Sequence, residues 1–202
     1  MSLRDELIGA PRTLPAYQLV LPSGWREYSA DDANEQTLLE QAKARLRSQH
    51  RPDLAAQLAQ ASRDAFARMR QSNTIAFYLQ ADAPDEQVMP ISISASRLAA
   101  PDGGTLDAQV SDLVRNHGAE AFNDDFVLVR WQVSSTRQLG AERIGTLSIS
   151  YLAPIPGTMR REGLQFVAVI LHPVGLESDD PSVAKLAFVC DAIMSTFAWL
   201  PA

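Results

Sequence analysis

The stretch that most constrains this chain is residues 163–173, GLQFVAVILHP, in which apolar side chains occupy both alternating sets of positions. Successive side chains of a strand point to opposite faces of a sheet, so this strand must be covered on both faces. After a short acidic loop, residues 182–199 carry an apolar stripe at helical spacing: Val183, Leu186, Cys190, Ile193 and Phe197. The two segments together predict a central strand with a helix packed on it.

The remaining strands are expected to be antiparallel. Alternating apolar and polar residues predict strands within 16–22, 25–28, 74–81, 88–98, 124–135 and 138–154. In the fourth of these, Ile91, Ile93 and Ala95 share one face, and the serines between them, Ser92, Ser94 and Ser96, share the other. Such alternation is typical of a half-exposed strand, so we expect these serines to face solvent. A short helix is expected at 105–118, capped by Thr105 and ended by Gly118.

Residues 31–71 predict the longest helical element. Asp32 and Glu35 form a capping-box-like start, and two apolar stripes follow at helical spacing. Pro52 interrupts them, because the residue before a proline avoids the helical region. The segment is therefore either a helical hairpin or one helix kinked near Pro52. With residues 1–15 as an N-terminal tail, residues 16–202 are expected to form a single α+β domain, an antiparallel sheet flanked by helices.

Composition excludes several classes of function. The net charge of −6 argues against non-specific binding to nucleic acid or to an anionic membrane. No run approaches the roughly 18–20 apolar residues of a membrane span, and the first fifteen residues lack the apolar core of a secretory signal. The single cysteine, Cys190, cannot form an internal disulfide and lies on a core stripe. We therefore expect a cytoplasmic protein with no nucleic-acid or membrane partner.

Nothing in the sequence predicts a catalytic or metal site. His50, His117 and His172 are far apart and have no ligand at metal spacing. The chain contains no G-x-S-x-G elbow, and Gly103-Gly104 lacks the lysine of a phosphate loop. The acidic residues near Asp180 lack the pattern of a calcium loop and instead begin a helix. We expect no enzyme activity and no cofactor.

Two exposed basic groups are the candidate partner-binding residues. Lys43, Arg47 and Arg51 lie at the end of the first long helix, where cations also suit the helix dipole. Met159, Arg160 and Arg161 lie in the 156–163 turn, which is either a recognition loop or an ordinary solvated hairpin tip. If the two long helices form an antiparallel hairpin, the cations at the end of the first helix and those at the end of the second helix would lie apart. A homodimer through the 31–71 hairpin is one arrangement the sequence leaves open.

The order of elements and two short motifs resemble the PsbP-like fold family. The motifs are Leu21-Pro22-x-Gly24-Trp25 after the first strand and Phe197-x-Trp199 at the end of the last helix. The family includes the extrinsic PsbP subunit of photosystem II, the Ran-binding Mog proteins and the bacterial LpqN lipoproteins. The resemblance implies an antiparallel sheet with helices on both sides, and binding or accessory roles without a catalytic centre. The chain departs from the family in its long 31–71 segment and in having no lipobox cysteine.

Two functions remain after these exclusions. The first is a non-enzymatic module that binds an unknown protein partner or acts as its accessory. The second is a small-molecule binder, or an enzyme, that uses a pocket between the sheet and the helices. The second function requires a deep cavity with convergent polar groups, which a structure can reveal.

Overall fold

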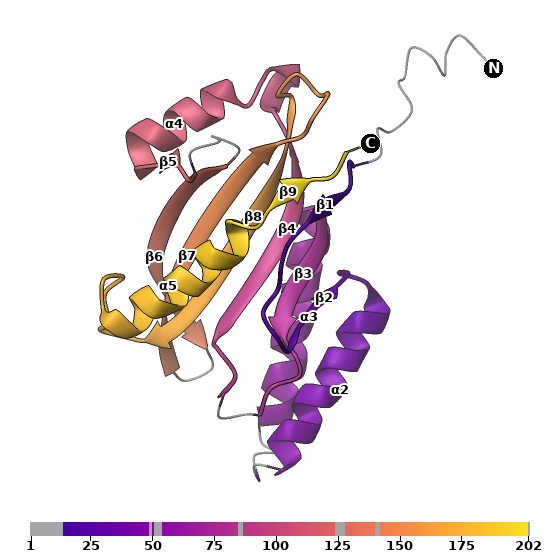
Figure 1. The fold of residues 1–202 in the computed structure, drawn as a ribbon. Helices are drawn as coiled ribbons and strands as arrows, with labels where there is room; N and C mark the ends of the chain where they lie inside the picture. The colour runs from indigo at the N-terminus through magenta and orange to yellow at the C-terminus, as the bar shows by residue number, and fades with distance from the viewer. Residues whose placement is uncertain are drawn as a thin grey trace, which may run out of the picture.

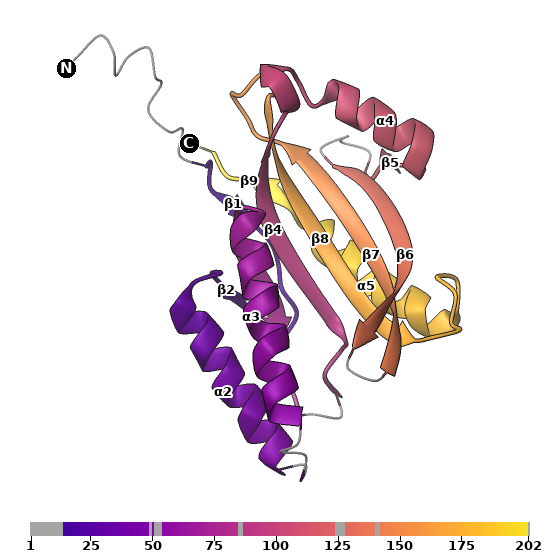
Figure 2. The same ribbon diagram turned by 180° about the vertical axis from the view of Figure 1, so that it is seen from behind.

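The structure is a computed structural model that describes residues 14–48, 50, 54–84, 87–123, 128–139 and 142–201. Within these residues the architecture is α+β, as the sequence predicts, with helices on both faces of an antiparallel sheet (Figures 1 and 2). The helices are α2 (Asp32–Ser48), α3 (Ala55–Gln71), α4 (Asp107–His117) and α5 (Pro181–Met194). The strands are β1 (Tyr17–Gln18), β2 (Trp25–Tyr28), β3 (Thr74–Gln80), β4 (Ile91–Ala99), β5 (Glu120–Ala121), β6 (Val129–Leu139), β7 (Glu142–Pro154), β8 (Glu162–Pro173) and β9 (Ala198–Trp199).

The main sheet has seven strands in the order β2-β3-β4-β8-β7-β6-β5, and every neighbouring pair is antiparallel. β8 lies in the middle, between β4 and β7, which confirms the central place that its apolar pattern predicts. Its inward side chains Leu164, Phe166, Ala168 and Ile170 are fully buried. Strands β6, β7 and β8 form the expected three-strand meander.

One face of the sheet is covered by α5 and by the small β1–β9 pair (Figure 1). The helix begins at Asp180, whose side chain accepts a hydrogen bond of 2.8 Å from the backbone N–H of Ser182, with Pro181 at the first position. Val183, Cys190 and Ile193 are buried against the strands. Burial raises the pKa of the Cys190 thiol to about 12, as expected for an unreactive core cysteine.

Three polar side chains join α5 to β6 and β7. The Tyr151 hydroxyl donates to Oδ1 of Asp191 at 2.5 Å, and Nε of Arg130 donates to the same oxygen at 2.8 Å. The Tyr151 side chain is fully buried, and that burial, together with the Asp191 carboxylate, raises the pKa of its phenol. We call this set, Arg130, Tyr151 and Asp191, the α5 clamp. In the α5 clamp, each polar group that lies inside the α5 interface has a hydrogen-bond partner.

The opposite face carries the α2–α3 hairpin at one end and α4 at the other (Figure 2). The hairpin is antiparallel, because Nη1 of Arg70, at the end of α3, lies 3.1 Å from carboxylate oxygens of both Asp32 and Glu35, at the start of α2. The expected cap at Asp32 is wrong. Asp31 caps the helix instead, since its Oδ1 accepts from the backbone N–H of Asn34 at 2.8 Å.

Two other local expectations change. The first strand is shorter than the pattern suggests, because β1 pairs only with β9, while Leu19 and Leu21 pack against the core. The helix α4 starts after Leu106 with no side-chain cap, since the Thr105 hydroxyl bonds to Asp107. Its end is as predicted, with Gly118 in the left-handed conformation at φ 63°. The tail predicted for 1–15 lies mostly outside the described residues.

Candidate functional site

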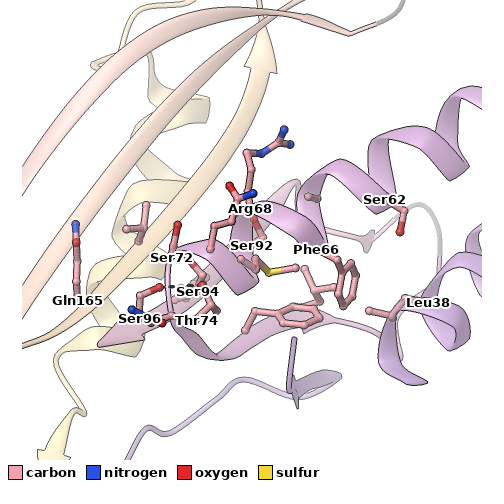
Figure 3. Close-up of a pocket in the computed structure, with 18 of the residues that line it drawn as sticks. Leu38, Ser62, Phe66, Arg68, Ser72, Thr74, Ser92, Ser94, Ser96 and Gln165 are labelled. Atoms are coloured by element: carbon pink, nitrogen blue, oxygen red, sulfur yellow. Dashed lines mark hydrogen bonds between the residues drawn. The ribbon is translucent and has the colours of Figure 1, made fainter. Parts of the chain in front are cut away.

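A large groove lies between the α2–α3 hairpin and the sheet, with a volume of about 940 Å³. Its walls come from α2 and α3, and its floor comes from β3, β4 and β8. Small-molecule sites typically enclose about 300–1,000 Å³, so this groove has the capacity of a ligand site. Figure 3 shows its lining side chains.

One end of the groove is apolar. Phe66 of α3 is its anchor: the ring is buried and packs edge-on against Phe77 of β3, with ring centroids 5.5 Å apart. Phe77 in turn stacks on Tyr28 at 5.5 Å. The rest of this end is aliphatic: Leu38, Leu39, Ala42, Leu58, Met69 and Leu79. The apolar stripes of both helices therefore meet the sheet here without filling the space.

The floor at the other end is polar. It contains Thr74, Ser94, Ser96 and Gln165, which Figure 3 places together, away from Leu38 and Phe66, whereas Ser92, the strand partner of Leu79, lies nearer Phe66. Oγ1 of Thr74 and Oγ of Ser96 share a hydrogen bond of 2.9 Å. Within the described part of the chain, the side chains of Ser92, Ser94 and Gln165 have no hydrogen-bond partner. Three polar side chains thus remain available to a ligand.

This position corrects the prediction that the β4 serines form a solvent face. Ile91, Ile93 and Ala95 share one face, as predicted, and are buried in the core with the side chains of α5. The serines share the other face, but the hairpin lies over that face and leaves them half-buried. Strand alternation separates the two faces correctly and carries no information about what lies above each face.

The charge of the groove has one sign. Its lining contains three arginines, Arg45, Arg68 and Arg97, and neither an aspartate nor a glutamate, although the chain has a net charge of −6. Arg97 is neutralised, because its Nε donates to Glu162 at 2.7 Å. Arg68 is exposed and has no ion-pair partner among the described residues. An anion in the groove would therefore meet no repelling carboxylate on its walls.

The lining does not resemble a hydrolytic site. A serine nucleophile needs a neighbouring base, and no histidine, lysine or carboxylate lines the groove among the described residues. Over the same described ranges, no three His, Cys, Asp or Glu side chains gather closely enough to hold a metal ion. The groups that are present can donate hydrogen bonds, attract an anion and bury apolar surface, which are the properties of a binding site.

The predicted partner-binding residues of α2 do not line this groove. Lys43 pairs with Glu40 of its own helix at 2.8 Å, and Arg47 is exposed in the last turn. Arg51 lies outside the described residues. The groove instead takes Leu38, Leu39 and Ala42 from the inner side of α2. A role for Lys43 and Arg47 in binding a partner stays a prediction.

Met159, Arg160 and Arg161 lie at the β7–β8 turn, far from the C-terminal end of α2 (Figure 1). Met159 is 70% exposed. Arg160 pairs with Asp107 at the start of α4, with 3.2 Å between Nη1 and Oδ1. Met159 and Arg160 both have positive φ, 53° and 59°, which side-chain-bearing residues seldom adopt. The structure does not bring this turn together with Lys43 and Arg47 of α2, so the predicted residues that it describes form two separate groups.

Strand β6 presents an open edge that the sequence did not single out. β5 pairs with it only at Val129 and Arg130, so, among the described residues, 131–137 pair with β7 on one side alone. Residues 132–138 are exposed. Natural sheets usually protect such edges with prolines or several charges. This edge has no proline and, from 131 to 138, the single charge of Arg137.

Comparisons with known proteins leave the family open. No protein-family model matches the chain, and no curated protein matches it. A solved structure of a point mutant of the protein Mog1 is 13% identical, covers 63% of this chain and 80% of that chain, and superposes with a TM-score of 0.38. A score this low supports no argument about function. Among the described residues, none of the helices has the length and apolar character needed to cross a membrane.

Proposed function

We propose that this chain is a non-enzymatic binding protein that holds an apolar-bodied ligand in the groove between the α2–α3 hairpin and the sheet. The observation that supports the proposal is the groove itself, about 940 Å³ with an apolar end and convergent hydroxyl groups on its floor. Specific sites combine a mostly apolar lining with a few placed polar groups. Of the two functions open from the sequence, the small-molecule binder required a cavity of this kind. The lack of a base beside the serines favours binding over catalysis.

The test is saturable binding of the neutral, polarity-sensitive dye Nile red. We expect one dye per chain, with its emission shifted to the blue by an apolar site. Ser94→Trp should abolish binding, because Ser94 lies on the groove floor and an indole there would occupy the space. Thr136→Trp, at an exposed position of β6, is the control and should bind normally. Dye binding that does not saturate, or that survives Ser94→Trp in a folded protein, contradicts the proposal.

A second candidate function, protein binding, is favoured by the open edge of β6. An edge strand with unpaired backbone groups can add a strand from another chain. A second copy of this chain fits. If two β6 strands pair antiparallel about Ser134, Trp131 lies opposite Arg137 and no like charges face each other. Such a cross-strand Trp–Arg pair is favourable. Self-association would account for the open edge of β6, and it does not involve the groove.

Sedimentation velocity tests this second candidate. We expect a dimer for the wild type, and a monomer for Ser134→Lys, which would place two lysines opposite each other at the pairing axis. Ser111→Lys, at an exposed position of α4, is the control and should remain dimeric. A monomeric wild type at about 100 μM, well above the micromolar range of ordinary specific association, rules out self-pairing. A dimer that survives Ser134→Lys would point instead to the 31–71 hairpin as the interface.

A further inference from the structure

We infer that the ligand of the groove is a single-chain anionic amphiphile, an aliphatic chain that ends in a carboxylate. The inference rests on the proposed function, because it takes the groove as a ligand site and identifies the chemistry of its occupant. The carboxylate would lie near Arg68 and the polar floor, and the chain would lie along Phe66 toward Leu38. Three features of the groove lead to this assignment.

The first feature is the separation of polar and apolar side chains along the groove. Figure 3 shows Ser94, Ser96, Thr74 and Gln165 toward one end, and Phe66 and Leu38 toward the other. A ligand that satisfies both ends needs one polar terminus and one apolar terminus. A ligand that is polar throughout would leave the aromatic and aliphatic end without its burial gain, and one that is apolar throughout would leave the floor hydroxyls without partners.

The second feature is the sign of the charge. Arg45, Arg68 and Arg97 line the groove, and carboxylates do not. Glu162 neutralises Arg97, whereas Arg68 has no partner among the described residues. The contrast with Arg70, two residues later on α3, supports a specific role: Arg70 is held between Asp32 and Glu35 and joins the two helices. Of these two cations on one helix, one is used by the fold and the other is open to a ligand.

The third feature is the match between a carboxylate and the available donors. The guanidinium group offers a planar fork that binds carboxylates with two parallel hydrogen bonds. The hydroxyl of Ser94 and the amide of Gln165, on neighbouring strands of the floor, can rotate to donate to a carboxylate oxygen. A cationic head group would find the acceptor oxygens of these side chains but would be repelled by Arg68. The arrangement therefore distinguishes an anion from a cation and from a neutral alcohol.

Displacement of Nile red by matched twelve-carbon ligands tests the inference. We expect dodecanoate to displace the dye about tenfold more strongly than dodecanol, as for one charge-assisted contact at a partly exposed site. In Arg68→Gln, dodecanoate should fall to the level of dodecanol, while dodecanol itself is unchanged. Arg68→Lys should keep part of the preference. The control is Arg63→Gln on the same helix, because Arg63 bonds to Gln60 and does not line the groove.

The outcomes separate the two proposals. If dodecanoate and dodecanol displace the dye equally from the wild type, the anionic ligand is wrong and the groove remains a binding site. If Arg68→Gln keeps the full preference for dodecanoate, Arg68 does not bind the carboxylate, and that part of the inference is overturned. If Nile red itself does not bind, both the proposed function and this inference are overturned. Because Arg68 is exposed, its substitution should leave the thermal unfolding midpoint unchanged, and that measurement shows that any lost preference does not come from unfolding.

Discussion

Replacing Asp191 by alanine will lower the free energy of unfolding by about 2–3 kcal/mol, because it removes the central acceptor of the α5 clamp. The fully buried Tyr151 hydroxyl loses the carboxylate oxygen that lies 2.5 Å away. Arg130, whose side chain is 16% exposed, loses its ion-pair partner at the same time. Asp191 itself is 30% exposed, so water can replace part of the lost interaction, and the expected effect stays below that of a fully buried ion pair.

Matched variants assign the loss to the two contacts. Tyr151→Phe removes only the hydroxyl and should cost about 1 kcal/mol. Asp191→Asn keeps an acceptor for the phenol but removes the charge opposite Arg130, so it should fall between wild type and Asp191→Ala. In the double variant Asp191→Ala/Tyr151→Phe, the second substitution should recover part of the stability lost in Asp191→Ala, because no buried hydroxyl is then left unpaired. Urea unfolding followed by tryptophan fluorescence compares all four variants with the wild type. A change below about 0.5 kcal/mol for Asp191→Ala, the usual range for surface substitutions, would mean that the clamp does not hold α5.

The parts of this fold that could be predicted from the sequence are those that local patterns determine. The continuous apolar run of β8 indicates a strand with neighbours and cover on both sides, and the stripe through Cys190 indicates a helix buried on one face. Asp180-Pro181 marks where that helix begins. Each pattern involves residues within one element, and the physical requirement, burial of apolar surface with satisfied helix ends, acts on that element alone.

The sequence left a pocket between sheet and helices open as an alternative, but the lining of the groove could not be predicted, because it depends on how distant elements pack. Ser92, Ser94 and Ser96 share a face by alternation, but the α2–α3 hairpin that lies over them precedes them in the chain by more than twenty residues. Arg68 and Arg70 look equivalent in the sequence, as two cations in the last turn of one helix. Only the packing of α3 against α2 gives Arg70 two carboxylates and leaves Arg68 on the groove.

The open edge of β6 escaped prediction for the same reason. The three-strand meander β6-β7-β8 follows from short turns and alternation. Which of its outer strands becomes an edge depends on β4, which pairs with β8 along nine residues from Ile91 to Ala99. That pairing joins segments about seventy residues apart in the chain, and no local pattern specifies it. Both sites that we propose, the groove and the edge of β6, are therefore produced by long-range packing.

Replacing Phe66 by alanine should release the α2–α3 hairpin from the sheet. Phe66 is the one fully buried side chain of α3, which the structure describes throughout, and it packs on Phe77. Loss of a buried phenylalanine side chain typically costs about 3–5 kcal/mol. Few other buried residues join this hairpin to β3, so we expect the loss to appear first as local opening rather than as global unfolding.

Hydrogen exchange can distinguish local opening from global unfolding. In Phe66→Ala, amides of α2 and α3 should exchange faster, by a factor on the order of 10² for the roughly 3 kcal/mol lost. Amides of β7 and β8 should keep their protection, because the α5 face of the core is untouched. Phe188→Ala is the matched control, since Phe188 is 72% exposed on α5 and should change exchange nowhere. Nile red binding should disappear in Phe66→Ala alone, because the groove exists only while the hairpin lies on the sheet. A variant with an open hairpin and undiminished dye binding would place the ligand site elsewhere.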